Sequence, residues 1–183
     1  MRLGAMSDTH GDTQAWERAL VAFAGCDLVV HCGDILYHGP FNPILPTYSP
    51  RDLASAINEA PFPVVFAKGN CDSEVDQLAL SFPIQQPMAL VHLNGFKLIA
   101  LHGHLYDEKG LEALGKEYGA DLIIRGHTHE REIKKVDGLV ILNPGSASIP
   151  KTGAPTASII DTDAKAIEII DLEGRKAIAK ETF

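Results

Sequence analysis

Ser7-Asp8-Thr9-His10-Gly11 follows an apolar run at the start of the chain and precedes a helical pattern that begins near Thr13. An aspartate and a histidine therefore emerge together at the end of a predicted strand. Residues two apart lie on the same face of a strand, so we expect Asp8 and His10 to point the same way and to share a cation. This pair gains its significance from four later stretches of the same kind.

Each of these later stretches also follows an apolar strand and carries aspartate, asparagine or histidine: Gly33-Asp34, Gly69-Asn70, His102-Gly103-His104 and Gly126-His127-Thr128-His129. Ligands in α/β sheets gather beyond the carboxyl ends of the strands. The five stretches together offer seven donors that suit divalent cations, Asp8, His10, Asp34, Asn70, His102, His127 and His129. Seven donors are more than one ion takes from protein, so two ions about 3.5–4 Å apart that share a carboxylate fit better.

The order of the predicted elements indicates an α/β fold. Apolar runs and helical spacing predict strands over 2–7, 27–31 and 64–67 that alternate with helices over 13–24 and 50–59. Asn94-Gly95 and Asp137-Gly138 predict two hairpins, with strands over 88–93, 96–101, 132–136 and 139–142. A helix over 109–118 and strands over 122–124, 157–161 and 166–171 complete the pattern. We expect two packed mixed sheets with helices outside, a four-layer α/β/β/α sandwich.

The composition is that of a globular protein, with 183 residues, 45% hydrophobic and 22% charged. We expect one domain over residues 1–183. The formal net charge of −8 argues against a nucleic-acid-binding surface, but not against an anionic substrate, because bound cations would invert the local field. The 3 cysteines form no C-x-x-C pair, no signal peptide is visible, and no apolar run approaches the roughly 18 residues of a membrane span. These features predict a cytoplasmic location.

The five polar stretches, taken in order, resemble the motif blocks of calcineurin-like metallophosphoesterases. The likeness narrows at His38-Gly39-Pro40, at residues 69–76 and at Asn143-Pro144-Gly145-Ser146, which are similar to the small bacterial and archaeal phosphodiesterases of the YfcE type. This resemblance covers essentially the whole chain. It implies the metallophosphoesterase fold and a phosphodiesterase that uses two divalent ions, most commonly Mn²⁺. Iron, zinc, cobalt and nickel also suit these ligands.

The resemblance also assigns the ligands. Asp8, His10 and His129 would bind the first ion, Asn70, His102 and His127 the second, and Asp34 would bridge the two. Only a carboxylate can bridge two cations while it offsets their repulsion. A water between the ions would have its pKa lowered toward neutrality, and the resulting hydroxide would attack phosphorus in line with the departing alkoxide.

One residue departs from the wider superfamily, in which a histidine after Gly-Asn protonates the leaving group. This chain has Cys71 at that position. A thiol is mostly protonated at neutral pH but is a poor hydrogen-bond donor, so substrates with good leaving groups are favoured. We expect His104 to lie near the substrate phosphate. Whether it transfers a proton or only donates a hydrogen bond to a neighbouring group stays open.

Other polar residues are candidates for substrate contacts. His38 and Asn42 lie in the proline-rich stretch 37–50, and Tyr106 lies just after His102-Gly103-His104. Loops as long as 37–50 are usually functional or disordered. The stretch is therefore either a rigid surface excursion or a lid or oligomer contact beside Asp34.

Several polar residues have a simpler interpretation. Lys68 could reach a phosphate, but a lysine in this position is more often solvated. Asp72 is expected to orient a neighbour rather than bind metal, and His31 and His92, inside predicted strands, are interpreted as structural. The charged run 173–181 is interpreted as solvated surface.

Two alternatives to the phosphodiesterase remain. The same site could serve a phosphomonoesterase, and Cys71 favours diesters only weakly. The fold also occurs in a retromer subunit that acts as a protein-binding scaffold, although a scaffold need not retain all seven donors. The expected partner is a small-molecule phosphodiester, with no membrane and with a homo-oligomer possible. The sequence does not separate a nucleotide diester from a phospholipid headgroup or a phosphonate.

Overall fold

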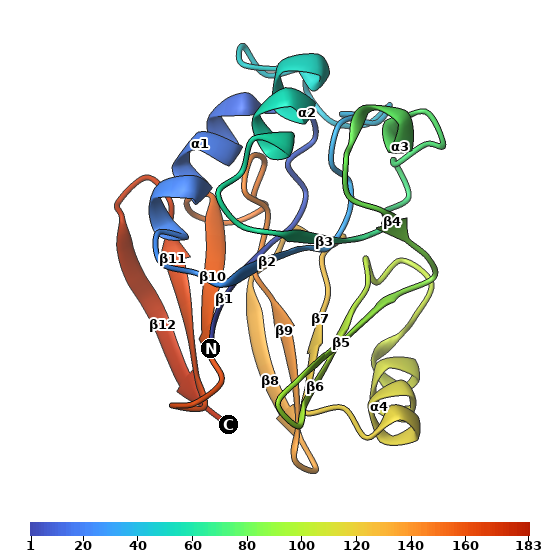
Figure 1. Ribbon diagram of the computed structural model, residues 1–183, viewed down its shortest axis with the longest axis vertical. Helices are drawn as coiled ribbons and strands as arrows, with labels where there is room; N and C mark the ends of the chain where they lie inside the picture. The colour runs from blue at the N-terminus through green and yellow to red at the C-terminus, as the bar shows by residue number, and fades with distance from the viewer.

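The computed structural model describes residues 1–183 and contains two mixed β-sheets (Figure 1). The larger sheet is built from β1 (Arg2–Met6), β2 (Leu28–His31), β3 (Val64–Ala67), β4 (Ile84–Gln85), β10 (Thr156–Asp161), β11 (Ala166–Asp171) and β12 (Lys176–Thr182). Its strand order is β12-β11-β10-β1-β2-β3-β4. The smaller sheet is built from β5 (Ala89–Leu93), β6 (Phe96–Ala100), β7 (Leu122–Ile124), β8 (Glu132–Val136) and β9 (Leu139–Asn143). Its order is β5-β6-β7-β9-β8.

Four helices connect the strands: α1 (Thr13–Ala22), α2 (Pro50–Asn58), α3 (Asp76–Ala79) and α4 (Glu108–Tyr118). The Asp12 carboxylate caps the start of α1 by accepting a hydrogen bond from the backbone N–H of Gln14 at 3.1 Å. Asp107 caps α4 in the same way, and α4 ends at Gly119, whose left-handed backbone favours glycine. Local sequence signals therefore set where α1 and α4 begin and where α4 ends.

Three apolar layers hold the fold together. Helices α1 and α2 cover the larger sheet through a cluster that contains Trp16, Leu53 and Phe66. The two sheets pack on each other through a second cluster, and α4 covers the smaller sheet through a third. Each fully buried side chain of this size stabilises the fold by about 1.5–3 kcal/mol. This layer order confirms the expected α/β/β/α sandwich.

The parallel core of the larger sheet explains how the sequence pattern works. Strands β1, β2 and β3 pair in parallel, with Gly4 opposite Val29 and Val30 opposite Val65. A parallel sheet is covered on both faces, so its strands are apolar runs rather than alternating patterns. In the smaller sheet, β6, β7 and β9 are also parallel. The polar stretches that follow β1, β2, β3, β6 and β7 all lie beyond carboxyl ends, as expected.

Three short or exposed elements were not anticipated. Helix α3 and strand β4 contain 4 and 2 residues, which is too short for a periodic signal. Strand β12 is exposed along its whole length, so the charged run 173–181 is surface, as expected, but is also an edge strand. Its charges form ion pairs, such as Lys180 with Glu168 at 2.7 Å, and charged edges discourage pairing with other chains. No helix of the chain has the length and apolar character that a membrane crossing requires.

Candidate metal centre

The loops that carry the candidate ligands have an unusual backbone. Five of the seven ligands have positive φ: Asp8 (57°), His10 (46°), Asp34 (56°), His127 (70°) and His129 (58°). A left-handed conformation costs a residue with a side chain about 1–2 kcal/mol. The tertiary structure must therefore hold these residues in place, and strain of this kind clusters at functional sites.

The expectation that Asp8 and His10 share a strand face is wrong. Strand β1 ends at Met6, and both residues lie beyond it in left-handed conformations. The two side chains nevertheless face each other, with 3.8 Å between His10 Nε2 and Asp8 Oδ1. The loop, and not the pleat of the strand, brings them together.

Asp8 is the centre of the cluster. Its Oδ1 is buried and has no hydrogen-bond partner. Three imidazole nitrogens surround this oxygen, His129 Nε2 at 3.2 Å, His10 Nε2 at 3.8 Å and His102 Nε2 at 4.0 Å. A buried carboxylate oxygen without a donor is costly unless another positive group completes the site.

The same three histidines are oriented by their other ring nitrogen. Nδ1 of His10, His102 and His129 lies 3.0, 2.8 and 2.9 Å from the backbone carbonyls of Tyr37, Cys32 and Ile149. A carbonyl only accepts, so each Nδ1 must carry a proton, and a neutral ring directs the lone pair of Nε2 at the cluster. This arrangement is typical of histidines that bind metal. The residues present therefore fit divalent cations.

Asp34 is the second carboxylate of the cluster. Its Oδ2 lies 3.3 Å from His102 Nε2 and 3.7 Å from His10 Nε2, and its Oδ1 accepts from the backbone N–H of Cys71 at 2.8 Å. Three compact ligand groups share these atoms: Asp8 with His10 and His129, Asp8 with Asp34 and His102, and His10 with Asp34 and Cys71. Asp8, His10 and Asp34 each belong to two of these groups, and Asp34 is the carboxylate that lies closer to both His10 and His102.

The electrostatics of the cluster favour positive charge. Burial disfavours a charged imidazole, but the hydrogen bond to Asp34 and the two carboxylate charges raise the pKa of His102 to about 9. The pKa of His129 is also raised, because Asp8 outweighs burial. The pKa values of Asp8 and Asp34 are lowered despite burial, because of these histidines. Cations that bind here must therefore displace protons.

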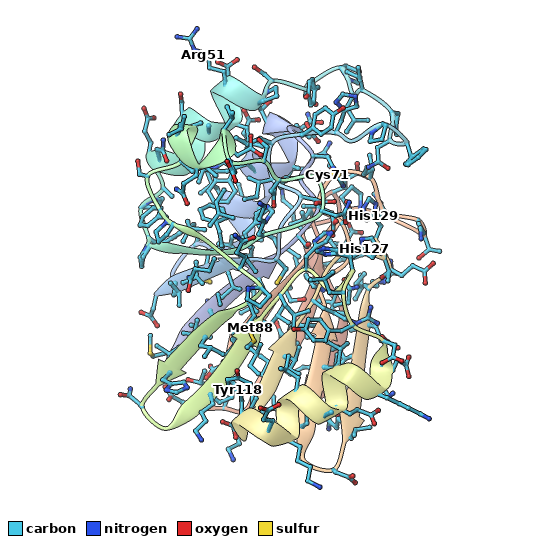
Figure 2. The ribbon with its side chains drawn as sticks, turned by 90° about the vertical axis from the view of Figure 1, so that its right-hand side faces the viewer. Arg51, Cys71, Met88, Tyr118, His127 and His129 are labelled. Carbon is cyan, nitrogen blue, oxygen red and sulfur yellow. The ribbon has the colours of Figure 1, made fainter.

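Asn70 and His127 form the more open side of the cluster. Asn70 Oδ1 lies 3.0 Å from His102 Nε2, and the rings of His127 and His102 are 5.1 Å apart. Both Asn70 and His127 are exposed, whereas Asp8, His10 and His102 are buried. Figure 2 shows His127, His129 and Cys71 in the same part of the view, with Cys71 above the two histidines. The structure thus brings all seven predicted ligands into one region, with His127 at its edge.

Asp72 joins two of the ligand loops. Its Oδ2 accepts from the backbone N–H groups of Asp34 at 2.8 Å and Gly69 at 2.7 Å, and its Oδ1 accepts from Ile35 at 2.7 Å. Burial raises the pKa of Asp72 to about 6. A side chain at Gly69 would overlap Asp34, so the close approach of the two loops requires glycine. Asp72 is therefore placed to orient neighbours, as the sequence indicates.

The turn from Asn143 to Ser148 holds two other ligand loops, a role that the sequence pattern did not reveal. Ser146 Oγ and Ser148 Oγ each donate to the backbone carbonyl of Asp8 at 2.8 Å. Asn143 Nδ2 donates to the carbonyl of Gly126 at 3.1 Å, just before His127. The motif block at 143–146 was the available signal, but it indicated only a turn.

His31 supports the loop that carries Asp8 and His10. The backbone N–H of Gly33 donates to His31 Nδ1 at 3.2 Å, so Nε2 carries the proton and donates to Thr9 Oγ1 at 3.0 Å. Burial lowers the pKa of His31 to about 3, which keeps the ring neutral. This geometry agrees with the interpretation of His31 as a structural residue.

The candidate catalytic residues flank the cluster. The ring of the exposed His104 is 5.4 Å from that of His102 and 5.9 Å from that of His127. Cys71 belongs to one of the compact ligand groups, and burial together with the nearby Asp34 raises the pKa of its thiol to about 12. Cys71 is therefore a thiol and not a thiolate at neutral pH.

The two candidate substrate contacts differ. Asn42 Nδ2 lies 3.5 Å from His10 Nε2 and lines the cavity over the cluster. The ring of His38 instead packs edge-on against Tyr37 and Tyr48, with ring centroids 4.7 and 5.1 Å away. His38 does not line that cavity, because these aromatic contacts turn it away. The structure brings Asn42 to the site but not His38.

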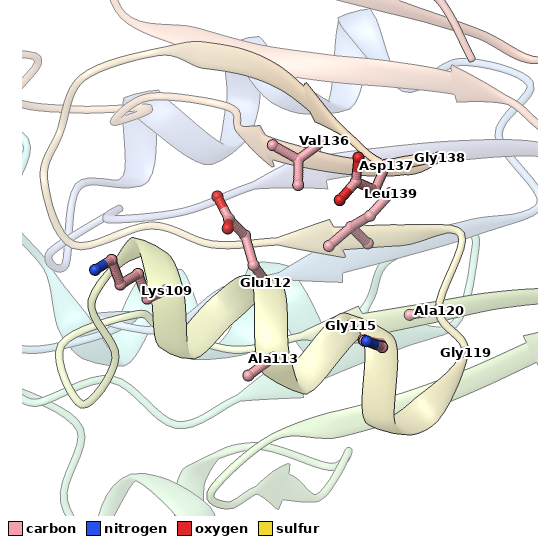
Figure 3. A pocket seen from close by; sticks show the side chains of 11 residues that line it. Lys109, Glu112, Ala113, Gly115, Gly119, Ala120, Val136, Asp137, Gly138 and Leu139 are labelled. Atoms are coloured by element: carbon pink, nitrogen blue, oxygen red, sulfur yellow. The ribbon is translucent and has the colours of Figure 1, made fainter.

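Two sizeable hollows lie at different ends of the molecule. A cavity of about 800 Å³ opens over the cluster and is lined by Asp34, Asn70, Cys71, His127 and His129 together with loop residues. A groove of about 710 Å³ lies between α4 and the β8–β9 turn (Figure 3). Lys109, Glu112 and Asp137 line this groove, without any of the ligand groups. The candidate metal ligands therefore adjoin the first cavity and not this groove.

Comparisons with known proteins agree with this geometry. Residues 1–165 match the model of the calcineurin-like phosphoesterase superfamily domain. The chain is 39% identical to phosphodiesterase YfcE of Escherichia coli over 183 residues, which cover 98% of this chain and 97% of the relative. The solved structure of YfcE, a phosphoesterase from E. coli, superposes with a TM-score of 0.89 at 37% identity and covers 100% of this chain and 99% of that one.

Two further matches extend the comparison. A phosphodiesterase of Methanocaldococcus jannaschii is 30% identical over 181 residues, which cover 94% of this chain and 100% of the relative. Vacuolar protein sorting 29 of Cryptosporidium parvum superposes with a TM-score of 0.72 at 18% identity, and covers 100% of this chain and 97% of that one. At that identity the likeness is one of fold alone.

Proposed function

This chain belongs to the calcineurin-like phosphoesterase superfamily, and from that premise we propose that it is a metal-dependent phosphodiesterase with two divalent ions in its site. One observation carries the proposal. The buried Asp8 Oδ1 has no donor, and the Nε2 atoms of three oriented histidines surround it within 4.0 Å. This combination is suited to a cation and to few other ligands.

We assign the ligands as follows. Asp8, His10 and His129 bind the first ion, Asn70, His102 and His127 bind the second, and Asp34 bridges them. Asp34 Oδ2 lies 3.7 Å from His10 Nε2 and 3.3 Å from His102 Nε2, between residues assigned to different ions, and this position supports its bridging role. The exposure of Asn70 and His127 leaves the second ion more accessible to solvent and to substrate.

The ligand set is nitrogen and oxygen, with the Cys71 thiol nearby. We propose Mn²⁺ as the working ion, while iron, zinc, cobalt and nickel also suit these donors. A bound pair supplies Lewis acidity and lowers the pKa of a bound water, so that water becomes a nucleophile at neutral pH. The oriented imidazoles fix where the ions lie, and the two carboxylates offset their charge.

The remaining polar residues act on the substrate. We propose that His104, beside His102 and His127, donates a hydrogen bond to the substrate phosphate. Cys71, whose thiol stays protonated, faces the same cavity and can donate only weakly to a leaving oxygen. Asn42 reaches His10 from the opposite wall and is proposed as a further phosphate contact. Good leaving groups should therefore react fastest.

The test is metal depletion followed by reconstitution. Protein stripped with a chelator should lose hydrolysis of bis(4-nitrophenyl) phosphate and recover it when Mn²⁺ is added. The hydrolysis rate recovered with every other first-row divalent ion, measured in parallel, ranks the metals. Absence of hydrolysis with every ion, from protein whose circular dichroism is unchanged, would contradict the proposal.

A phosphomonoesterase would use the same ligands. Rates on 4-nitrophenyl phosphate and bis(4-nitrophenyl) phosphate, measured with the same metal-loaded protein, separate the two activities. We expect the diester to be the better substrate, because the weak donor Cys71 faces the cavity. A cytoplasmic location, a single domain over 1–183 and a homo-oligomer also stay as predictions.

A further inference from the structure

Two clefts adjoin the metal centre, and Asn70 forms part of the wall of each. The first is the cavity of about 800 Å³ that contains Asp34, His127 and His129. The second is a cleft of about 490 Å³ lined by Lys68, Asn70, Gln86 and His104. A phosphodiester has two ester arms that leave one phosphorus atom. A phosphate held beside Asn70 could place one arm in each cleft.

The first cleft has an apolar and aromatic wall. Phe41, which is 97% exposed, lines this cleft together with Pro43, Ile149 and Pro150. The neighbouring Asn42 reaches to 3.5 Å from His10 Nε2, so Phe41 is one residue away from a contact with the ligands. An exposed aromatic ring at this position is a platform on which a planar group can stack.

The second cleft is lined by hydrogen-bond donors. Lys68, Gln86 and His104 line this cleft, and each has a side-chain N–H group that can donate a hydrogen bond. Asp72 lines the same cleft, but it is buried and its oxygens already accept from three backbone N–H groups. Lys68 is therefore the charge that the cleft offers to a ligand. A carboxylate or a phosphate is its complement.

The net charge of the whole chain bears on which of the two clefts can bind an anionic arm. With a formal net charge of −8, the surface as a whole repels anions. Lys151 also lines the first cleft, but the residues before it there, Ile149 and Pro150, are apolar, whereas Gln86 and His104 line the second cleft together with Lys68. An anionic arm is therefore favoured in the second cleft, beside Lys68.

We propose that the substrate is an asymmetric phosphodiester, with a planar aromatic arm against Phe41 and an anionic arm against Lys68. This inference rests on the proposed phosphodiesterase function. Hydrolysis forms a bond from the water oxygen to phosphorus and breaks the bond to the aromatic arm, whose oxygen leaves with the electron pair. The products are an aryl alcohol and a phosphomonoester that retains the anionic arm. Of the two protons of the water, one ends on the departing aryl oxygen and the other goes to solvent.

The test uses two 4-nitrophenyl phosphodiesters of matched shape. Their second arm is either 2-carboxyethyl or 3-methylbutyl, in which two methyl groups replace the carboxylate oxygens. Metal-loaded wild-type protein should prefer the carboxylate ester by about tenfold in kcat/KM, since charged hydrogen bonds are strong. Lys68→Met should remove the preference and leave the neutral ester unaffected, and Lys68→Arg should restore it. Lys151→Met is the matched control and should retain the preference.

Phe41 is tested separately. Phe41→Ala should raise KM for both esters about fivefold with little change in kcat, because stacking acts on binding. Leu78→Ala removes a side chain that is 87% exposed on α3 and should change neither constant. Equal effects of the two variants would contradict the role of Phe41.

A binding measurement gives a readout that is independent of turnover. Calorimetry with 2-carboxyethyl phosphate, the expected product, should show about tenfold weaker binding to Lys68→Met than to wild type. If bis(4-nitrophenyl) phosphate is not hydrolysed at all, the proposed function fails. If it is hydrolysed but the carboxylate ester is not preferred, or if Lys151→Met and not Lys68→Met removes the preference, only the two-cleft inference fails.

Discussion

The metal-centre loops and the hairpin turns share one backbone feature for different reasons. Nine residues other than glycine have positive φ, and five of them are candidate ligands. The other four lie in turns between strands: Asn94, Asp137, Lys165 and Arg175. In both regions a left-handed backbone turns the chain sharply, but only one of the regions carries chemistry.

In the β5–β6 and β8–β9 hairpins, the left-handed conformation comes from local turn chemistry. Asn94-Gly95 and Asp137-Gly138 are dipeptides that favour positive φ, and Asn and Asp tolerate it best. In the site, the loops that carry His10, His127 and His129 contain no such turn dipeptide. Their loops are fixed from outside, by contacts such as those of Ser146 with Asp8 and of Asn143 with Gly126. Strain set by tertiary contacts, and not by the local sequence, marks the functional region.

The largest effect should separate the two regions by activity. Asp34→Ala removes the proposed bridging ligand and should lower kcat/KM for bis(4-nitrophenyl) phosphate by about 10³-fold or more. Asp137→Ala, at a positive-φ aspartate in a hairpin turn, should leave activity within about twofold. Steady-state kinetics at saturating Mn²⁺ measures both. Similar losses in the two variants would show that the left-handed backbone, and not the ligand, matters for activity.

The second effect concerns carboxylates that hold backbone N–H groups. Asp72→Ala leaves three buried N–H groups without an acceptor and should lower the free energy of unfolding by about 3 kcal/mol. Asp171 accepts from Glu173 and Gly174 in an exposed turn, where water can replace it, so Asp171→Ala should cost about 0.5 kcal/mol. Urea denaturation of the metal-free proteins compares them. Equal losses would contradict the clamping role of Asp72.

The smallest effect measures the strain directly. At His127, with φ of 70°, the Gly variant should be more stable than the Ala variant by about 1 kcal/mol. His104 is also exposed and is not among the positive-φ residues, so there the Ala variant should be the more stable. Thermal unfolding without metal gives the two differences. The same sign at both positions would refute strain at His127.

Much of the fold could be predicted from the sequence. The apolar runs at 28–31 and 64–67 and the Asn94-Gly95 turn are local signals, and the structure follows them. Helix α3 and strand β4 escaped prediction because they are too short to show a period. Strand β12 was not predicted because its charged side chains indicated only solvated surface, although its backbone pairs with β11.

The seven candidate ligands could also be named from the sequence, because each follows the carboxyl end of a strand in the parallel part of one of the two sheets. The positions of their side chains relative to one another could not be predicted from the sequence. The pleat of β1 suggested a shared face for Asp8 and His10, but left-handed loops place them. The aromatic packing that turns His38 away joins residues 37 and 48, and the serines that hold Asp8 lie about 140 residues downstream. Tertiary contacts of this kind leave no periodic signal.

The central claim is that the strained loops converge to hold a pair of cations. The most direct test is anomalous diffraction from crystals grown with Mn²⁺. Two peaks about 3.5–4 Å apart are expected, one beside Asp8, His10 and His129 and one beside His102 and His127, with Asp34 between them. No peak within the cluster, or a peak bound only at another surface, would contradict the claim.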